Sequence, residues 1–211
     1  MKLYGYWRSS ASWRVRIGLA YKGVRYEYQP VNLVQGGGEQ HSPGYRALNP
    51  MAQVPTLVLD DGRQLSQSMA ILEHLEETIV EPPLLPRDPY LRARARQLAE
   101  IVNAGIQPLQ NTGPLRELKR RGVDEREWAR HFIAAGLDAL EATAGPTAGS
   151  FLVADAPSIA DVLLVPQLYN ARRFELDVAR WPLLVRIEEA CALLPAFHSA
   201  HADRQPDAVA P

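Results

Sequence analysis

The sequence predicts an α+β domain over residues 1–80, a linker over 81–88 and an all-helical domain over 89–211. Three observations support this division. Strand and helix patterns alternate over the first 80 or so residues, and "EPPLLPRDP" (81–89) then interrupts them with four prolines. Beyond these prolines the strand patterns stop, and helical periodicity with capping residues dominates, which is typical of a helical domain.

The first three elements follow a strand, helix, strand order. "KLYGY" (2–6) is predicted to be a strand, and 13–22 a helix that Gly23 ends as a C-cap. "RYEYQPVNL" (25–33) is predicted to be a second strand. The helix carries a polar stripe formed by Arg14, Gly18 and Lys22.

A hairpin and another helix complete the first domain. "QGGGEQ" (35–40) is expected to be a flexible loop because three glycines lose much entropy in an ordered element. "VPTLVLDDGRQLSQS" (54–68) predicts two strands around an Asp-Gly turn, and a helix is expected from Ser66. The order β-α-β, then β-β-α, with the first two strands joined by a right-handed crossover, is that of a thioredoxin-like domain.

Four helices are expected in the second domain. Asp88-Pro89 resembles the N-cap and first position of one helix, Asp124-x-x-Glu127 caps another, and Ser158-x-x-Asp161 opens a third as a capping box. A fourth carries Cys191 on its apolar stripe. The polar, alanine- and proline-rich residues from about 202 are expected to form a frayed tail.

Composition excludes several classes of function. The net charge of −1 over 211 residues does not favour a nucleic-acid binder. A single cysteine excludes an intramolecular disulfide and a cysteine-based metal cluster, and the five histidines are scattered, so no metal site is expected. Without a signal-peptide pattern or an apolar run long enough to span a bilayer, we expect a cytoplasmic protein with no membrane partner.

The stretch "WRSSASWRVR" (7–16) lies where the first strand leads into the first helix. A thioredoxin-like fold places its reactive group there, because the helix N-terminus favours an anion. A redox enzyme would keep C-x-x-C at this point, whereas this chain has Ser9, Ser10, Ala11 and Ser12. Dithiol chemistry is excluded, so a thiolate held here must come from a diffusible thiol. The alternative is that the serines only cap the helix.

Two further patterns point to a peptide ligand. The proline of "QVPTL" (53–57) is expected to be cis and to leave the preceding backbone free for an extended peptide. "QSMAI" (67–71) begins a helix with a second N-terminal anion site, suited to a carboxylate. For both, an ordinary strand start or cap is the alternative. Together the three features describe a pocket for glutathione.

Five stretches carry a resemblance to a known family: "SSASWRVRIGLAYKG", "ALNPMAQVPTL", "LSQSMAILEHLEE", "GIQPLQN" and "SIADVLLVPQLYNARRFELD". They are similar to the zeta class of glutathione transferases, which includes maleylacetoacetate isomerase. The resemblance extends from Lys2 to about Phe197 and implies the glutathione transferase fold. The class signature S-S-C-S-W-R-V-R-I differs at one position only, where Ala11 replaces the family cysteine.

The resemblance assigns roles to individual residues. Ser9 and Ser10 would contact the glutathione sulfur, with Ser10 favoured for holding the thiolate. Arg8 and Arg173 are the candidate clamps for substrate carboxylates. The remaining positions that match glutathione-binding positions of the family are Gln40, Val54, Gln67, Ser68, Gln107, Asn111, Thr112 and Gly113. In the family the helical-domain positions reach glutathione partly from a partner subunit, so a homodimer is implied.

The implied reaction is a glutathione-dependent cis–trans isomerisation of maleylacetoacetate to fumarylacetoacetate in tyrosine degradation. It proceeds by thiolate addition, bond rotation and elimination. Three alternatives stay open: a maleylpyruvate isomerase, whose relatives carry an additional arginine near the positions of Thr112 and Gly113, a transferase acting on α-haloacids, and a non-catalytic glutathione-binding module. Loss of the cysteine at Ala11 is expected to have a modest effect on rate.

Overall fold

The computed structural model describes residues 1–209, and these form two compact units. Unit 1 comprises Met1–Pro83 together with the segment that starts at Leu194, and unit 2 comprises Leu84–Leu193. Within the described residues, no helix is both long and apolar enough to cross a bilayer. The thioredoxin-like domain and the helical domain of the prediction are both present, but the chain is divided between them differently at its C-terminal end.

Unit 1 contains a four-stranded sheet of order β2-β1-β3-β4. Its strands are β1 (Lys2–Gly5), β2 (Glu27–Pro30), β3 (Thr56–Val58) and β4 (Gln64–Ser66). β1 pairs with β2 in parallel and with β3 antiparallel, and β3 pairs antiparallel with β4. The predicted crossover and hairpin are therefore confirmed, although β2 is shorter than the stretch 25–33 that was predicted.

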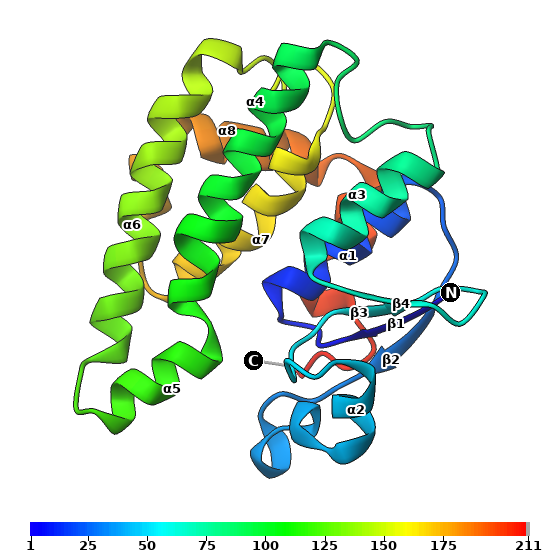
Figure 1. Cartoon of the computed structure of the whole chain (residues 1–211). Helices are drawn as coiled ribbons and strands as arrows, with labels where there is room; N and C mark the ends of the chain where they lie inside the picture. Colours follow the sequence, from blue (N-terminus) through cyan, green and yellow to red (C-terminus); the bar gives the residue numbers. More distant parts are fainter. Residues whose placement is uncertain (210–211) are drawn as a thin grey trace. The chain divides into compact units, whose positions relative to one another are not determined.

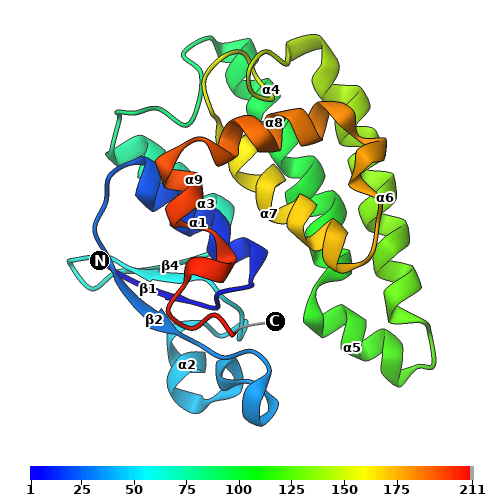
Figure 2. The ribbon, with the colours of Figure 1, turned by 180° about the vertical axis from the view of Figure 1, so that it is seen from behind.

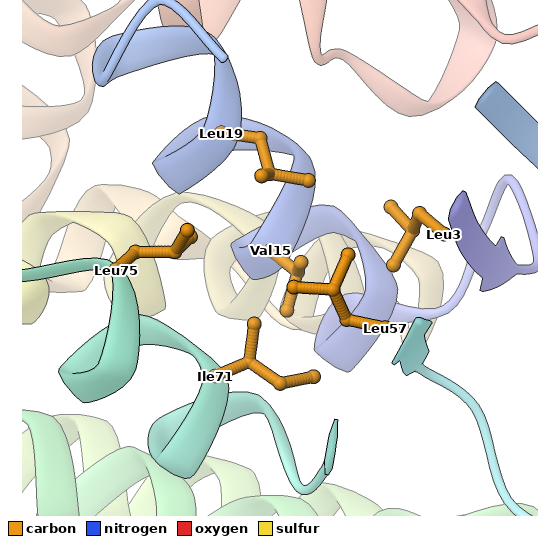
Figure 3. Packing of buried hydrophobic residues seen from close by; sticks show 6 residues of the cluster. All are labelled: Leu3, Val15, Leu19, Leu57, Ile71 and Leu75. Atoms are coloured by element: carbon orange, nitrogen blue, oxygen red, sulfur yellow. The ribbon is translucent and has the colours of Figure 1, made fainter. Parts of the chain in front are cut away.

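Helices α1 (Ser10–Tyr21) and α3 (Ser68–Thr78) cover one face of this sheet, and α2 (Pro43–Leu48) lies on the other side (Figure 1). The apolar core joins both helices to the two central strands, as Figure 3 shows; its fully buried residues are Leu3, Val15, Leu19, Leu57, Ile71 and Leu75. This core fixes the N-terminal ends of α1 and α3 on a common scaffold.

The polar stripe of α1 faces the interior of unit 1, where its two charged members, Arg14 and Lys22, are buried with hydrogen-bond partners. Lys22 Nζ lies 2.6 Å from Glu76 Oε2 and donates to the Ile79 carbonyl. A side chain at Gly18 would overlap that of Leu72, so glycine allows α1 and α3 to pack closely. Gly23 ends the helix as predicted, although the C-cap itself is Lys22: Gly23 follows it with φ +67° and, with the residue after it, donates to two carbonyls of the last turn.

The sequence analysis did not anticipate α2, whose start is nevertheless encoded locally. The Ser42 hydroxyl accepts a hydrogen bond from the backbone N–H of Tyr45, and Pro43 occupies the first turn. This serine-proline pair is a common helix start. The loop 35–40 forms two single 3-10 turns, η1 (Gln35–Gly37) and η2 (Glu39–His41).

Unit 2 is entirely helical apart from loops and one isolated bridge within residues 84–193. Its elements are α4 (Pro89–Glu100), the π-helix η3 (Ile101–Ile106), the 3-10 helix η4 (Gln107–Gln110), α5 (Thr112–Arg120), α6 (Glu125–Ala144), the single turn η5 (Gly145–Thr147), α7 (Ile159–Arg173), the single turn η6 (Val178–Arg180) and α8 (Pro182–Ala192). Asp88 and Asp124 cap α4 and α6 as predicted. α5 and the π-helix were not anticipated.

The segment after α8 requires a correction, since it was predicted to belong to the helical domain and to fray from about residue 202. Instead it belongs to unit 1, where α9 (Pro195–Ser199) packs against α1 and is followed by the turn η7 (Ala202–Arg204). Ala202 is fully buried. The physical reason is a buried cation: the Arg16 Nε donates to the Ala200 carbonyl across 3.2 Å.

Candidate active site

The turn between β1 and α1 uses two of its three serines to hold itself together. Ser9 is the N-cap of α1, and its hydroxyl oxygen accepts from the backbone N–H of Ser12 at 3.2 Å. The buried Ser12 hydroxyl accepts in turn from the backbone N–H of Tyr6 at 3.4 Å. The alternative of simple capping therefore describes the oxygen of Ser9, whereas the Ser12 hydroxyl binds the backbone of Tyr6 before the helix.

Ser10 differs from both neighbours. It is the first residue of α1, only 8% exposed, and its hydroxyl takes part in no hydrogen bond within residues 1–209. The first turn of α1 contains no acidic side chain. A helix N-terminus with a hydroxyl donor and no anion of its own can stabilise an external anion such as a thiolate.

Ala11 is the second residue of α1 and is partly exposed. A cysteine here would lie in the field of the helix N-terminus, which lowers a thiol pKa. The single cysteine of the chain, Cys191, is buried on α8, and its burial raises the pKa of its thiol far above the ordinary value. Neither position provides a reactive thiol, so a thiolate bound at this turn has to come from outside the chain.

The N-terminus of α3 forms the second anion-binding feature. Gln67 precedes the helix with a φ of 71°, which is unfavourable for a residue other than glycine. Its side chain makes no capping bond and is exposed. Ser68, the first helical residue, is buried, and its first turn again has no acidic side chain. Strain at a residue with an uncommitted amide is typical of a ligand-binding position.

Arg14 connects the two helix N-termini. This arginine belongs to the polar stripe predicted on the first helix, and its side chain is completely buried. Its Nη1 donates to the Ser68 hydroxyl oxygen at 3.4 Å. Its position on α1 thus links the helix that carries Ser10 to the residue that begins α3, and it brings a positive charge to that end of unit 1.

The Val54–Pro55 peptide is cis, as predicted. The carbonyl of Gln53 accepts from Asn49 Nδ2 and from the Tyr45 hydroxyl, both at 2.7 Å. Burial raises the pKa of Tyr45, which keeps its hydroxyl protonated as a donor. The backbone at Val54 is thereby fixed immediately before β3.

Gln40 lies in the turn η2, and only 5% of its surface is exposed. Its Oε1 is buried without a hydrogen-bond partner within the described chain, while Nε2 lies 3.2 Å from a ring nitrogen of His41. Gly38, at φ +103°, leaves the space that the Gln40 amide occupies. A buried acceptor without a partner is costly unless a ligand donates to it.

Unit 2 places its predicted residues on one continuous segment. Gln107 starts η4, Asn111 is the N-cap of α5 and accepts from the backbone N–H of Thr112, and Gly113 follows in the first turn. The π-helix η3 precedes this segment, and such irregular turns are frequent at functional sites.

A buried amide pair, which the sequence did not reveal, ties this segment to α7. Gln110 Nε2 donates to Gln167 Oε1 at 2.6 Å, and Gln167 Nε2 donates back to Gln110 Oε1 at 3.3 Å. Both side chains are buried. Gln167 lies in the otherwise apolar run "VLLVPQL" of α7, where a polar residue could have indicated such a pair, whereas Gln110 has polar neighbours in the sequence.

The candidate carboxylate clamps have different surroundings. Arg8 lies with its guanidinium 5.2 Å from the centre of the Trp7 ring, a cation–π contact. Arg173 is exposed at the end of α7 and donates to Asn170 Oδ1 at 3.2 Å. The neighbouring Arg172 forms two hydrogen bonds with the Glu188 carboxylate.

A thioredoxin-like unit whose first helix begins with serines in place of cysteines, followed by a helical unit, defines a glutathione transferase fold. Comparison with known proteins agrees: the family model for the glutathione S-transferase N-terminal domain matches residues 8–78.

Relatives match nearly the whole chain. The maleylacetoacetate isomerase of Rattus norvegicus is 47% identical over 97% of this chain and 94% of its own length. A crystal structure of the maleylacetoacetate isomerase of Anaeromyxobacter dehalogenans, with bound GSH in the active site, is 57% identical with a TM-score of 0.89, covering 99% of this chain and 97% of that one. The holo structure of a bacterial maleylpyruvate isomerase of the zeta class is 42% identical with a TM-score of 0.94, covering 99% and 100%. This chain belongs to the zeta-class glutathione transferase and maleylacetoacetate isomerase family.

Proposed function

We propose that this chain is a glutathione-dependent cis–trans isomerase of maleylacetoacetate. The observation that carries the proposal is Ser10: a hydroxyl at the first position of α1, nearly buried and without an intramolecular partner in the described chain. Its family relatives in rat and in Anaeromyxobacter are named maleylacetoacetate isomerases, and one of them was crystallised with GSH in its active site.

Unit 1 suits glutathione on its own structural features. The buried, unpaired Gln40 Oε1 is ready to accept from a peptide N–H, and the fixed backbone at Val54 can pair with an extended peptide. The N-terminus of α3, with Gln67 and Ser68, suits a carboxylate. Ser9 and Ser10 are left for the sulfur. These residues would hold glutathione.

When bound, glutathione supplies a thiol that adds as a thiolate to the conjugated double bond and leaves again after rotation. The residues of the chain have simpler tasks. The Ser10 hydroxyl donates to the sulfur, and the N-terminus of α1 favours the ionised form of the thiol. Arg14, beside Ser68, adds a buried positive charge that favours anions at this end of unit 1.

The substrate is a carboxylate, and cations are needed to hold it. We assign this role to Arg8, which Trp7 supports through its ring, and to Arg173. In unit 2 we assign glutathione contacts to Gln107, Asn111, Thr112 and Gly113 on the segment that the Gln110–Gln167 pair fixes to α7. The same clamps would stabilise negative charge that develops on the substrate.

We also propose that the protein acts in the cytoplasm as a homodimer, in tyrosine degradation. The dimer follows from the family resemblance, in which a partner subunit completes the glutathione site. Sedimentation equilibrium tests it, and a particle of one 23.5 kDa chain at micromolar concentration would contradict it.

The experiment supplies maleylacetoacetate with substoichiometric glutathione and follows fumarylacetoacetate, with maleylpyruvate and a chlorinated acetate as parallel substrates. We expect many turnovers per glutathione and a kcat/KM for maleylacetoacetate at least about tenfold above that for maleylpyruvate. Thr112 and Gly113 support this order, because neither can clamp a carboxylate. A faster reaction with maleylpyruvate would favour a maleylpyruvate isomerase. Halide release without isomerisation would favour a transferase that acts on α-haloacids. Glutathione binding without turnover would leave a binding module.

A further inference from the structure

The C-terminal segment of unit 1, residues 194–209, packs on the rest of that unit at the end where the α1 turn lies. Figure 2 shows α9 beside α1, and the two helices are in contact. His201, in the same segment, packs its ring edge-on to Trp13 of α1, with 4.7 Å between ring centres. The segment therefore contacts the helix whose N-terminus holds the proposed thiolate.

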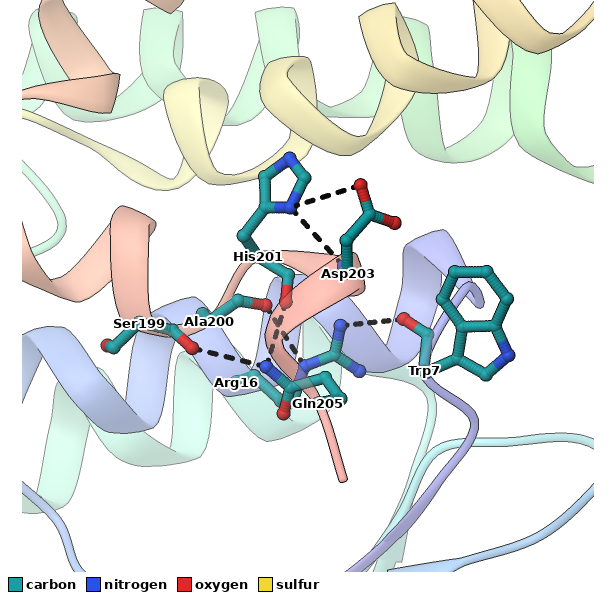
Figure 4. A network of polar contacts seen from close by, with 7 residues as sticks. All are labelled: Trp7, Arg16, Ser199, Ala200, His201, Asp203 and Gln205. Carbon is teal, nitrogen blue, oxygen red and sulfur yellow. Dashed lines mark hydrogen bonds and ion pairs between the residues drawn. The ribbon is translucent and has the colours of Figure 1, made fainter. Parts of the chain in front are cut away.

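A fully buried arginine on α1 joins this segment to the turn (Figure 4). Arg16 Nη2 donates to the Trp7 carbonyl at 2.8 Å, Nη1 lies 3.4 Å from the Tyr6 carbonyl, and Nε donates to the Ala200 carbonyl at 3.2 Å. Gln205 Nε2 closes the segment on itself through the carbonyls of Ser199 and His201. One guanidinium thus fixes the turn and the C-terminal segment to the same point.

Asp207 binds the backbone N–H of Trp7, whose carbonyl Arg16 binds. Its Oδ2 accepts from the backbone N–H of Trp7 at 2.9 Å and from the Tyr28 hydroxyl at 3.2 Å. Burial raises the pKa of Tyr28, so this hydroxyl stays a donor. Trp7 is therefore held at its N–H by Asp207 and at its carbonyl by Arg16, and Arg8 lies over its ring.

We propose that Asp207 is a positioning residue for the thiolate-binding turn, acting through Trp7 on Arg8, Ser9 and Ser10. This inference rests on the proposed function. The link is short: Trp7 precedes Arg8 directly, and the Ser9 N–H donates to the carbonyl of Tyr6, which Arg16 also contacts. Without the acceptor at Asp207, the Trp7 N–H loses its partner and the turn loses one of its two backbone anchors.

Charge and positioning predict opposite effects for Asp207, which makes the proposal testable. A carboxylate near a thiolate disfavours it, so removing the charge alone would lower the pKa of bound glutathione. Loss of positioning would raise it, because Ser10 and the helix N-terminus would no longer be held against the sulfur. Asp207→Asn removes the charge and keeps an acceptor, whereas Asp207→Ala removes both.

The experiment titrates the ultraviolet absorbance of the thiolate in the glutathione complex of the full chain and measures kcat and KM. For D207A we expect a thiol pKa higher by about half a unit or more and a kcat about tenfold lower. For D207N we expect a thiol pKa within about 0.3 unit of the wild-type value and a kcat within about twofold of the wild type. The titration needs only bound glutathione. It therefore tests the positioning role of Asp207 even if the isomerase assay shows that maleylacetoacetate is not the substrate.

Asp61→Ala is the matched control. Asp61 also accepts from a backbone N–H and a side chain, both of Arg63, but on the β3–β4 hairpin, near the opposite end of β1. It should leave the pKa and kcat unchanged. An unchanged or lower thiol pKa in D207A, or equal defects in D207A and D207N, would overturn the proposal.

A second variant covers the case in which D207A does not stay folded. Tyr28→Phe removes one of the two donors that fix Asp207 and leaves the carboxylate in place. A smaller rise of the thiol pKa in Y28F supports positioning, and no rise contradicts it.

Discussion

The helices α1 and α7 both have a serine as N-cap, Ser9 and Ser158, and their N-termini are completed in opposite ways. At α7 the chain supplies its own anion: Asp161 is fully buried and accepts from Leu152 N–H, Ser158 N–H and the Ser158 hydroxyl, all within 2.9 Å. At α1 the first turn has no acidic residue, and the Ser10 hydroxyl has no partner within residues 1–209.

The difference separates a folding feature from a functional one that uses the same physics. Both helix ends attract negative charge through unpaired N–H groups and the helix dipole. Where a side-chain carboxylate occupies the end, nothing remains for a ligand. Where the end is left open, an external anion can complete it. The following predictions test this distinction, from the largest expected effect to the smallest.

Asp161→Ala is expected to destabilise unit 2 by about 3–5 kcal/mol, because it leaves buried donors unpaired. Urea unfolding between pH 4 and 7 measures it. Burial raises the pKa of Asp161 to about 6, so the folded state binds the proton more tightly than the unfolded state. The contribution of Asp161 to the free energy of unfolding of the wild-type protein therefore falls by about 3 kcal/mol as the pH rises from about 4 to above 6. The D161A variant should lack this slope, and an equal slope in both proteins would contradict the assignment.

Ser10→Ala is expected to lower kcat about a hundredfold, since it removes the donor to the sulfur. Stability should change by less than about 0.5 kcal/mol, because the hydroxyl makes no intramolecular bond. Steady-state kinetics and urea unfolding of the same preparation provide the two numbers. A stability loss with full activity would make Ser10 a structural residue like Asp161.

Ser9→Ala should show the reverse pattern. Its oxygen caps α1, so a loss of about 1 kcal/mol in stability is expected, with a smaller decrease in kcat than for Ser10→Ala. Ser9→Asp is the useful companion, since it keeps a capping oxygen but adds a negative charge. It should retain stability and weaken thiolate binding. If Ser9→Ala lowered kcat more than Ser10→Ala did, Ser9 rather than Ser10 would be the main donor to the sulfur.

Much of this arrangement was predictable from the sequence because it depends on local rules. The caps at Asp88, Asp124 and Ser158, the Asp-Gly hairpin and the order of elements along the first domain all follow from patterns of neighbouring residues. Ser9 and Ser10 could be located in this way but not distinguished, since their difference lies in which hydroxyl oxygen receives a backbone N–H.

The features that were missed depend on contacts between distant parts of the chain. The residues from about 202 looked like a tail because they are polar and rich in alanine and proline, yet Asp207 attaches them to Trp7, and Arg16 holds Ala200 just before them. Arg14 and Lys22 looked like a polar face of α1, and their partners, Ser68 and Glu76, lie 54 residues away. No local pattern marks such pairs.

Ala11→Cys is expected to have the smallest effect, changing kcat by less than about threefold, because glutathione supplies the nucleophile. The new thiol would lie in the second position of α1, partly exposed, and should react faster with iodoacetamide than Cys191, whose burial raises its thiol pKa. Mass spectrometry of the modified protein measures this. A kcat gain of tenfold or more would show that the cysteine takes part in the chemistry.

The most direct test of the open helix end is the thiol pKa of glutathione bound to the wild-type protein. Ultraviolet titration of the complex measures it against free glutathione in the same buffer, with Ser10→Ala alongside. We predict a pKa at least about one unit below that of free glutathione in the wild type, and a return most of the way to the free value in Ser10→Ala. A bound thiol that titrates like the free one in the wild-type protein would contradict the account.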